Sequence, residues 1–278
     1  MNEEQYVRPP VVAGMFYPEH ERELRTTVES LLAGVRTTRK SGKLVGIIVP
    51  HAGYQYSGGT AAEAYALLKH RKQTTVILIG PSHREYFDGV SVFPGASFTT
   101  PLGHVDVDTK LRSELLRRLP GILNSLAGHR MEHSLEVQLP FLQVLIEEMK
   151  IVPIVVGNQK REYCEELGNA IADIAGESEI LLIASSDLSH YYNSEAAQKL
   201  DAVAIASIKK LDYGAFMSDL ETERTEACGG GPIVAVLCAA TKMGADRCDI
   251  LHACNSGEIS GDTDRVVGYV SAAIWKTH

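Results

Sequence analysis

Three histidines of the chain follow strand-like runs of apolar residues. His51 ends the segment VGIIVPH, His83 ends TVILIGPSH, and His190 ends ILLIASSDLSH. Residues just past the carboxyl ends of parallel strands meet at one edge of an open α/β sheet, where such sheets bind their ligands. We therefore expect the three imidazoles to lie close together, although any one of them alone could equally be a solvated loop residue. Grouped imidazoles can bind a transition metal or transfer protons.

Two further residues could belong to the same site. Asp187 stands three residues before His190 and could orient an imidazole, supply a metal ligand or simply cap a turn. Cys228 precedes three glycines and an apolar segment, in TEACGGGPIVAVLCAA, that we expect to be helical. A thiolate at a helix N-terminus is stabilised by the exposed N–H groups and the helix dipole, which favours metal binding or nucleophilic attack. Cys238, inside the apolar segment, is expected to be a small core residue.

A cysteine- and histidine-rich segment near the end of the chain is a weaker candidate. Cys248, His252 and Cys254 lie within seven residues in CDILHAC. This segment is expected to be a strand, and a straight strand cannot fold three of its own side chains around one tetrahedral ion. A structural zinc site is therefore not expected here.

Three other patterns each allow two interpretations. The residues Ser57, Gly58 and Gly59 are expected at a helix start, where they could hold an anion, but the segment matches neither GxGxxG nor a P-loop. His133 and Glu136 could both face a pocket rim, or Ser134 could cap an ordinary surface helix that Pro140 kinks. Likewise, Tyr54 and Tyr192 could line the site or serve as packing aromatics.

The elements that must position these residues alternate between strand and helix. Such alternation predicts a single α/β domain with a mostly parallel central sheet flanked by helices. The segment between His83 and His104 is expected to leave the sheet, and a β-hairpin is expected to close the chain. The expected strands are 44–49, 75–79, 151–156, 179–184, 249–255 and 265–273, and the expected helices are 57–70, 108–119, 134–150, 160–175, 194–211 and 231–243.

Composition excludes several classes of protein. The 278 residues are 45% hydrophobic and 22% charged, and the net charge is −8, so a basic nucleic-acid-binding surface is not expected. Apolar runs are far shorter than the roughly 18 residues of a membrane span, and the start MNEEQY does not resemble a signal peptide. Five cysteines, an odd number, do not suggest a disulfide framework. We expect a cytoplasmic protein of one domain spanning residues 1–278, in which RTTRKSGK at 36–43 is the only linker-like stretch.

A series of motifs resembles a known family. In order they are RPPVVAGMFYP, VPHAGYQYSG, LIGPSH, TTPLG, EHSLEVQLPFLQ, SSDLSHY, EACGGGP and SGDTDRVVGYVS. Together they resemble the Memo family, whose prokaryotic branch is called AmmeMemoRadiSam system protein B. The resemblance implies a fold similar to class III extradiol dioxygenases of the LigB type. It also implies a pocket built from His51, His83, Asp187, His190 and Cys228.

The resemblance assigns roles to these residues. His51, His83 and Cys228 match the metal-binding positions, and Cys228 replaces the carboxylate with which the dioxygenases bind Fe(II). Fe(II) is the expected ion, and a soft thiolate is also compatible with copper or zinc. By analogy, His190 is the acid or base and Asp187 orients it.

These roles favour a metal-dependent redox enzyme, similar to a non-heme iron dioxygenase, that acts on an unidentified small molecule. Two alternatives remain. One is a non-catalytic protein that binds an anionic or phosphotyrosine-type ligand in this pocket, as animal Memo proteins are described to do. The other is a zinc or thiol hydrolase with Cys228 as nucleophile and His190 as base. The family name also implies a functional link to an Ammecr-like protein and a radical SAM enzyme.

Overall fold

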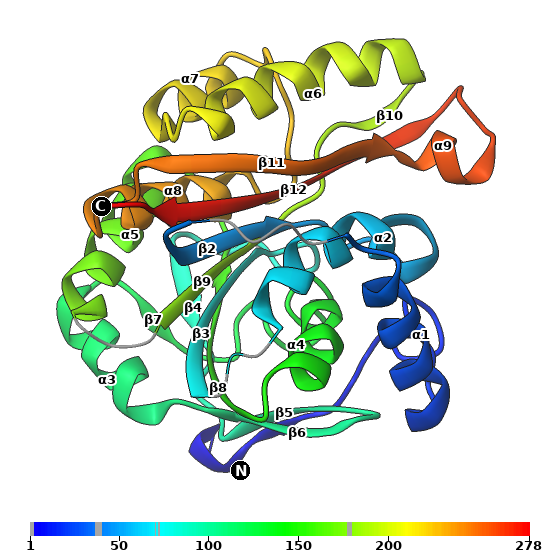
Figure 1. Ribbon diagram of the computed structural model, residues 1–278. Coiled ribbons are helices and arrows are strands. Elements are labelled where there is room, and N and C mark those ends of the chain that lie inside the picture. The colour runs from blue at the N-terminus through cyan, green and yellow to red at the C-terminus, as the bar shows by residue number, and fades with distance from the viewer. Residues whose placement is uncertain (1–2, 37–40, 70, 72, 177–179) are drawn as a thin grey trace.

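A mostly parallel β-sheet forms the centre of the computed structural model, which describes residues 3–36, 41–69, 71, 73–176 and 180–278 (Figure 1). Val- and Ile-rich strands fill this sheet and are buried on both faces, as parallel strands between two helical layers are. The predicted α/β fold is therefore confirmed. The parallel strands lie side by side in the order β6 (Gly103–Val107), β8 (Glu148–Val156), β3 (Gln73–Pro81), β9 (Ile180–Ser185) and β2 (Lys43–Val49).

Antiparallel strands extend the sheet at both sides. Next to β2 lies β12 (Val266–Lys276), which also pairs with β11 (Arg247–Asn255) and with β10 (His190–Tyr192). The expected C-terminal hairpin is therefore present, and the short helix α9 (Ser256–Ser260) lies in its connection. At the other side the strands are β5 (Ser97–Thr100), β1 (Val7–Arg8), β4 (Val90–Val92) and β7 (Leu123–Asn124).

Helices cover both faces of the sheet. Alternate strand residues face opposite layers, so that Ile48 packs into one hydrophobic cluster while Ile47 and Val49 pack into the other. The first cluster contains α3 (Thr109–Arg118), α5 (Arg161–Ala175), α6 (Ser194–Lys209), α7 (Tyr213–Glu221) and α8 (Gly230–Lys242). The second contains α1 (Glu21–Ala33), α2 (Tyr54–Tyr65) and α4 (Leu139–Leu145). Short 3₁₀ helices lie at η1 (Glu3–Gln5), η2 (Ala66–Leu68) and η3 (Glu136–Gln138).

The expected helix over 134–150 is wrong. After η3 the chain forms only the short α4, and β8 already begins at Glu148. Residues 148–150 pair with residues 73–75 of β3, so the backbone groups that would continue the helix bond to the sheet instead. Pro140 lies in the first turn of α4, where its missing N–H costs nothing, and does not kink a longer helix.

Glu136 lies neither on a pocket rim nor on a surface helix. Its side chain is fully buried and forms an ion pair of 2.8 Å with the equally buried Arg8. The same carboxylate accepts hydrogen bonds from the N–H groups of Val11 and Val12 and from the hydroxyl of Tyr17. These contacts attach the N-terminal segment to the segment that precedes α4.

Several other expectations can be compared with the fold. The helices expected at 108–119, 160–175, 194–211 and 231–243 are confirmed to within two residues at each end. By contrast, α2 begins at Tyr54, so Ser57, Gly58 and Gly59 lie inside the helix and not at an anion-binding start. Residues 37–40 of the linker-like stretch, residue 70 and residue 179 lie outside the described residues. Within the described ranges, no helix combines the length and apolar character needed to cross a membrane.

Candidate functional site

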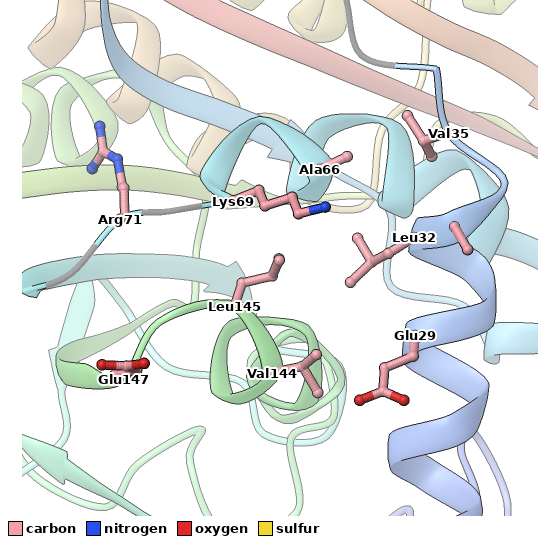
Figure 2. A pocket seen from close by; sticks show the side chains of 10 residues that line it. Glu29, Leu32, Val35, Ala66, Lys69, Arg71, Val144, Leu145 and Glu147 are labelled. Carbon is pink, nitrogen blue, oxygen red and sulfur yellow. The ribbon is translucent and has the colours of Figure 1, made fainter.

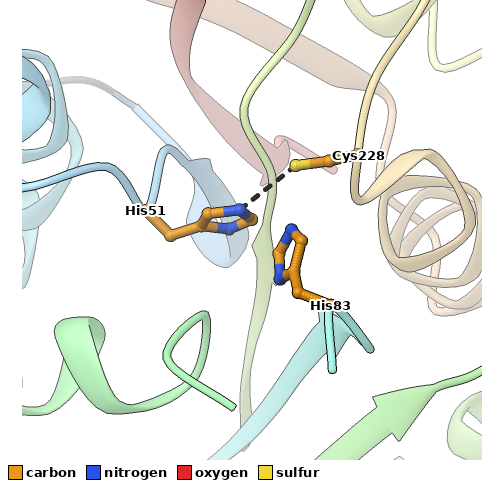
Figure 3. Close-up of side chains that lie close together, drawn as sticks. All are labelled: His51, His83 and Cys228. Carbon is orange, nitrogen blue, oxygen red and sulfur yellow. Dashed lines mark hydrogen bonds between the residues drawn. The ribbon is translucent and has the colours of Figure 1, made fainter. Parts of the chain in front are cut away.

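Three potential metal donors meet at the carboxyl edge of the parallel strands. His51 follows β2, His83 follows β3, and Cys228 lies just before α8, and Figure 3 shows their side chains turned toward one another. One nitrogen of each imidazole and the sulfur of Cys228 all lie within 4.8 Å of one another. The strand ends thus bring these side chains together, as their sequence positions led us to expect.

The hydrogen bonds of His51 define which of its ring nitrogens is free. Its Nδ1 lies 2.9 Å from the hydroxyl of Ser185, which donates its own proton to the carbonyl of Ser134 at 2.7 Å. The Ser185 oxygen also accepts a hydrogen bond from the amide of Gln138. Since its only proton is used, this oxygen must accept from Nδ1–H of His51. The lone pair on Nε2 of His51 therefore faces the Cys228 sulfur, 3.1 Å away.

His83 is held by the buried carboxylate of Glu132, to which the sequence analysis assigned no role. Nδ1 of His83 lies 2.9 Å from one oxygen of Glu132, and the main-chain N–H of His83 donates to the other at 2.6 Å. Burial alone would raise the pKa of Glu132. The hydrogen bonds and charge of His83, together with the N–H of Ser134, outweigh burial and lower that pKa to about 2. Glu132 is thus a carboxylate that accepts from Nδ1 of His83, and in the neutral ring the lone pair then lies on Nε2.

Cys228 is a thiol in the metal-free protein. Burial, together with the nearby carboxylate of Asp187, raises its pKa well above the ordinary value. This result corrects the expectation that the N-terminus of α8 would stabilise a thiolate. The N–H of Cys228 donates to the carbonyl of Asp187, and its sulfur accepts the N–H of Asp187 at 3.3 Å.

The first amides of α8 are already engaged by other groups. The N–H of Gly229 donates to the hydroxyl of Ser186 at 2.9 Å, and that of Gly231 donates to the side chain of Gln159 at 2.6 Å. Because both N–H groups already have acceptors, neither is available to the Cys228 sulfur. The same engagement removes the donors with which a helix N-terminus binds an anion.

Asp187 and His190 lie beside the three donors. The buried carboxylate of Asp187 has a raised pKa, mainly because of burial, and accepts the main-chain N–H of His51 at 2.8 Å. This contact is with His51 and not with His190, the residue that Asp187 was expected to orient. His190 begins β10, is partly exposed and lines a cavity of 460 Å³ together with Cys228.

His133 joins the group as a further imidazole. Its ring stacks on His83 with a centroid distance of 4.7 Å and meets His51 edge-on at 5.4 Å. Its Nδ1 lies 3.4 Å from the carboxylate of Glu132. The structure therefore places His133 beside the candidate metal donors and not on an ordinary surface helix.

Other residues singled out by the sequence serve elsewhere. Tyr54 is buried and donates its hydroxyl to the carbonyl of Val137. Tyr192 is exposed and donates to Glu226. His252 and Cys254 of β11 both contact the hydroxyl of Thr60. Among the described residues, the groups of side chains that could hold a metal ion include no residue of β11.

A second cavity lies at the opposite edge of the sheet. This space has a volume of 580 Å³, and residues of α1, η2 and α4 line it. Figure 2 shows apolar side chains such as Leu32 and Leu145 toward its interior. Arg71 and Glu147, which precede β3 and β8, place it at the amino ends of the strands. The described residues that line it include neither histidine nor cysteine, so the donors of the candidate site are not repeated there.

Buried neutral histidines predict a steep loss of stability in acid. Burial lowers the pKa of His51 and His129 to about 3 and that of His133 to about 4, below the ordinary value of 6.5. Below pH 6.5 the unfolded chain binds these protons while the fold does not, so stability is lost as pH falls from 6.5 toward 3. Near pH 5 we expect metal-free protein to take up about three protons on unfolding, measured as the pH dependence of urea denaturation.

A matched variant tests this assignment. The ring of His129 contacts the carbonyl of Ser91 at 3.1 Å, away from the three donors. His129→Gln is therefore expected to remove about one of the three protons. Stability that does not change between pH 7 and pH 5 would contradict the burial of neutral histidines.

Comparison with known proteins identifies the family. A model of Memo-like proteins matches residues 8–273. A MEMO1 family protein of Methanosarcina mazei is 40% identical over 276 residues, covering 96% of this chain and 99% of the relative. MEMO1 family proteins of Methanocaldococcus jannaschii and Thermoplasma volcanium are 40% and 37% identical, over 96% and 95% of this chain and 99% and 97% of the relatives.

A solved structure of an uncharacterized protein from Escherichia coli K12 aligns with 82% of this chain and 99% of that chain. Its sequence identity is 15% and its TM-score 0.49, a similarity too low to support an inference about function. The family match and the archaeal relatives, by contrast, extend over nearly the whole sequence. The chain belongs to the Memo family.

Proposed function

We propose that the chain is a metal-dependent redox protein whose ion is bound by His51, His83 and Cys228. The observation that carries the proposal is the convergence of one nitrogen of His51, one nitrogen of His83 and the sulfur of Cys228 within 4.8 Å. We propose Fe(II) as the ion. Copper and zinc are the competing ions, because a thiolate and two imidazoles also suit them.

The donor set fits a metal ion in its protonation as well as its position. His51 has a pKa of about 3, so it offers its lone pair at neutral pH without losing a proton. Cys228 must lose its proton to bind, which couples metal binding to proton release. The partners of both Nδ1 atoms, Ser185 and Glu132, hold the rings in the orientation that such a site needs.

The surroundings suit a reaction on a small molecule. A bound Fe(II) ion would supply the binding and reduction of O2, as in the extradiol dioxygenases whose fold the resemblance to the Memo family implies. The cavity beside Cys228 could hold a small molecule, and His190 on its wall could transfer a proton to or from it. The carboxylate of Asp187 accepts the main-chain N–H of His51 and so holds the loop that carries this proposed metal ligand.

The two alternative functions receive less support. A thiol hydrolase needs a reactive thiolate, whereas burial keeps Cys228 protonated. A binder of phosphotyrosine-type ligands needs free donors, whereas the first amides of α8 already have partners. The link to an Ammecr-like protein and a radical SAM enzyme stays a prediction.

Anaerobic purification followed by elemental analysis tests the proposal. We expect about one iron per chain, retained through gel filtration, because three preformed donors favour slow release. About one copper or zinc per chain would keep the metal site and change the ion. Protein that takes up none of the three metals when they are added anaerobically would contradict the proposed function.

A further inference from the structure

Glu132 forms an unusual contact, because one carboxylate binds both the ring and the main chain of the same histidine. One oxygen lies 2.9 Å from Nδ1 of His83 and the other 2.6 Å from its main-chain nitrogen. The first oxygen also accepts the N–H of Ser134 at 2.8 Å. Only 1% of Glu132 is exposed, so water does not compete for these bonds. The carboxylate thus holds the end of β3 and the histidine ring together.

This contact determines which ring nitrogen of His83 carries the proton. An ionised carboxylate accepts hydrogen bonds and cannot donate them. At 2.9 Å from the carboxylate, Nδ1 must therefore be the protonated nitrogen. In the neutral imidazole Nε2 is then left with a lone pair, and the bond from the main-chain N–H fixes the loop from which the ring extends.

Different hydrogen-bond partners decide which ring nitrogen carries the proton in the two histidines of the candidate site. Ser185 accepts from Nδ1 of His51 only because its own proton is donated to the carbonyl of Ser134, so the choice of protonated nitrogen in His51 depends on a chain of neutral groups. For His83 the choice follows from the charge of Glu132 alone. A change that removes this charge but keeps its shape should therefore affect His83 and leave His51 as it was.

We propose that Glu132 is a positioning residue that keeps the proton of His83 on Nδ1 and directs Nε2 to the metal. Its relevance to metal binding rests on the proposed function. The tautomer itself can be measured in metal-free protein. A carboxylate behind a metal-binding histidine orients the ring and raises its basicity, and loss of such a partner typically costs about 10- to 100-fold in metal affinity.

Glu132→Gln tests the proposal with little change of shape. The amide has one accepting oxygen, whereas the carboxylate accepts from three donors: Nδ1 and the main-chain N–H of His83, and the N–H of Ser134. In either orientation the NH₂ group faces a main-chain N–H, and when it faces Ser134 it also faces Nδ1, which can then accept from it only if the ring proton moves to Nε2. The charge that holds the proton on Nδ1 is gone, so the tautomer with Nε2–H, which has no lone pair for the metal, is expected to become populated.

The first readout is the protonated ring nitrogen of His83, observed by long-range ¹H–¹⁵N NMR of metal-free protein in alkaline buffer, where imidazoles are neutral. We expect Nδ1–H in the wild type and a clearly populated Nε2–H form in Glu132→Gln, with His51 unchanged. Nε2–H on His83 in the wild type would overturn the proposal, even if the variant failed to fold.

The second readout is Fe(II) affinity, measured by anaerobic titration. Glu132→Gln is expected to bind roughly 10- to 100-fold more weakly. The control is Glu85→Gln, because Glu85 is an exposed carboxylate of the same region that accepts the N–H of Gly128 and should change neither readout. Equal affinity of Glu132→Gln and wild type would overturn the proposal. The expected tautomers without any Fe(II) binding would support the effect of Glu132 on His83 and contradict Fe(II) as the bound ion. If copper and zinc also failed to bind, the metal centre itself would be contradicted.

Discussion

Cys228→Ser is expected to lower Fe(II) affinity by at least roughly a hundredfold, more than the loss of a residue that only orients a ligand. A serine hydroxyl is a neutral and harder donor, whereas the thiolate contributes charge and softness to the site. The metal-free fold should survive the change. The serine can still contact Nε2 of His51 through its hydroxyl and bond its N–H to the carbonyl of Asp187.

The measurement is anaerobic Fe(II) titration with elemental analysis of the washed protein, accompanied by urea denaturation of the metal-free forms. Cys238→Ser is the matched control. Cys238 lies in α8 with 1% exposure, and its sulfur is 3.5 Å from the side-chain oxygen of Asn169, so a serine keeps a partner there. We expect unchanged metal content and a stability loss of about 1 kcal/mol at most. Equal Fe(II) binding by Cys228→Ser and wild type would remove Cys228 from the ligand set.

Part of this site was predictable from the sequence because topology alone brings it together. Apolar runs predicted the strands before His51 and His83, and the rule that parallel strands end at one edge then predicted their proximity. Cys228 was found because the glycines after it indicated a helix start. His190 also comes after a strand, β9, but it lies on the short strand β10, which pairs with β12. His51 and His83, by contrast, lie in the segments that directly follow β2 and β3.

The remaining site residues could not be predicted, because tertiary contacts define them. Glu132 lies in a segment without periodicity, and only the fold shows that its partner is His83, 49 positions away. Ser185 is an ordinary strand residue until its contact with His51 is known. The wrong helix over 134–150 has a similar cause, since pairing with β3 overrides the local apolar pattern there.

The thiolate reactivity expected of Cys228 failed for a related reason. The sequence correctly placed the cysteine before a helix, and an exposed thiol there would have a lowered pKa. In the fold, burial dominates and raises the pKa, and Ser186 and Gln159 take the helix amides that would have favoured the thiolate. The position of Cys228 before a helix could be predicted from the sequence. The desolvation of its thiol and the groups that occupy the helix N–H groups could not.

His190→Ala is expected to reduce turnover by roughly 10²- to 10⁴-fold, the usual contribution of a general acid or base. Fe(II) affinity should hardly change, because the described donor group contains His51, His83 and Cys228 but not His190. His190 lines the cavity beside Cys228, near enough that its charge contributes to lowering the pKa of His51. From this position it could transfer a proton to a substrate without binding the metal.

The measurement is O2 uptake by iron-loaded protein with a panel of catechols and related phenols. His104→Ala is the control, because His104 is an exposed histidine at the amino ends of the strands and its loss should leave uptake unchanged. Equal uptake by His190→Ala and wild type would show that His190 transfers no essential proton.

The same variant separates an enzyme from a binding protein. A residue that acts mainly in the transition state lowers turnover and leaves ground-state affinity nearly intact. If the pocket only binds a ligand, the wild type shows no uptake with any phenol, and His190→Ala changes only the affinity for that ligand. The two functions therefore differ in which quantity the substitution changes. Uptake by the wild type that falls in the variant at constant iron content would favour catalysis, because binding alone consumes no O2.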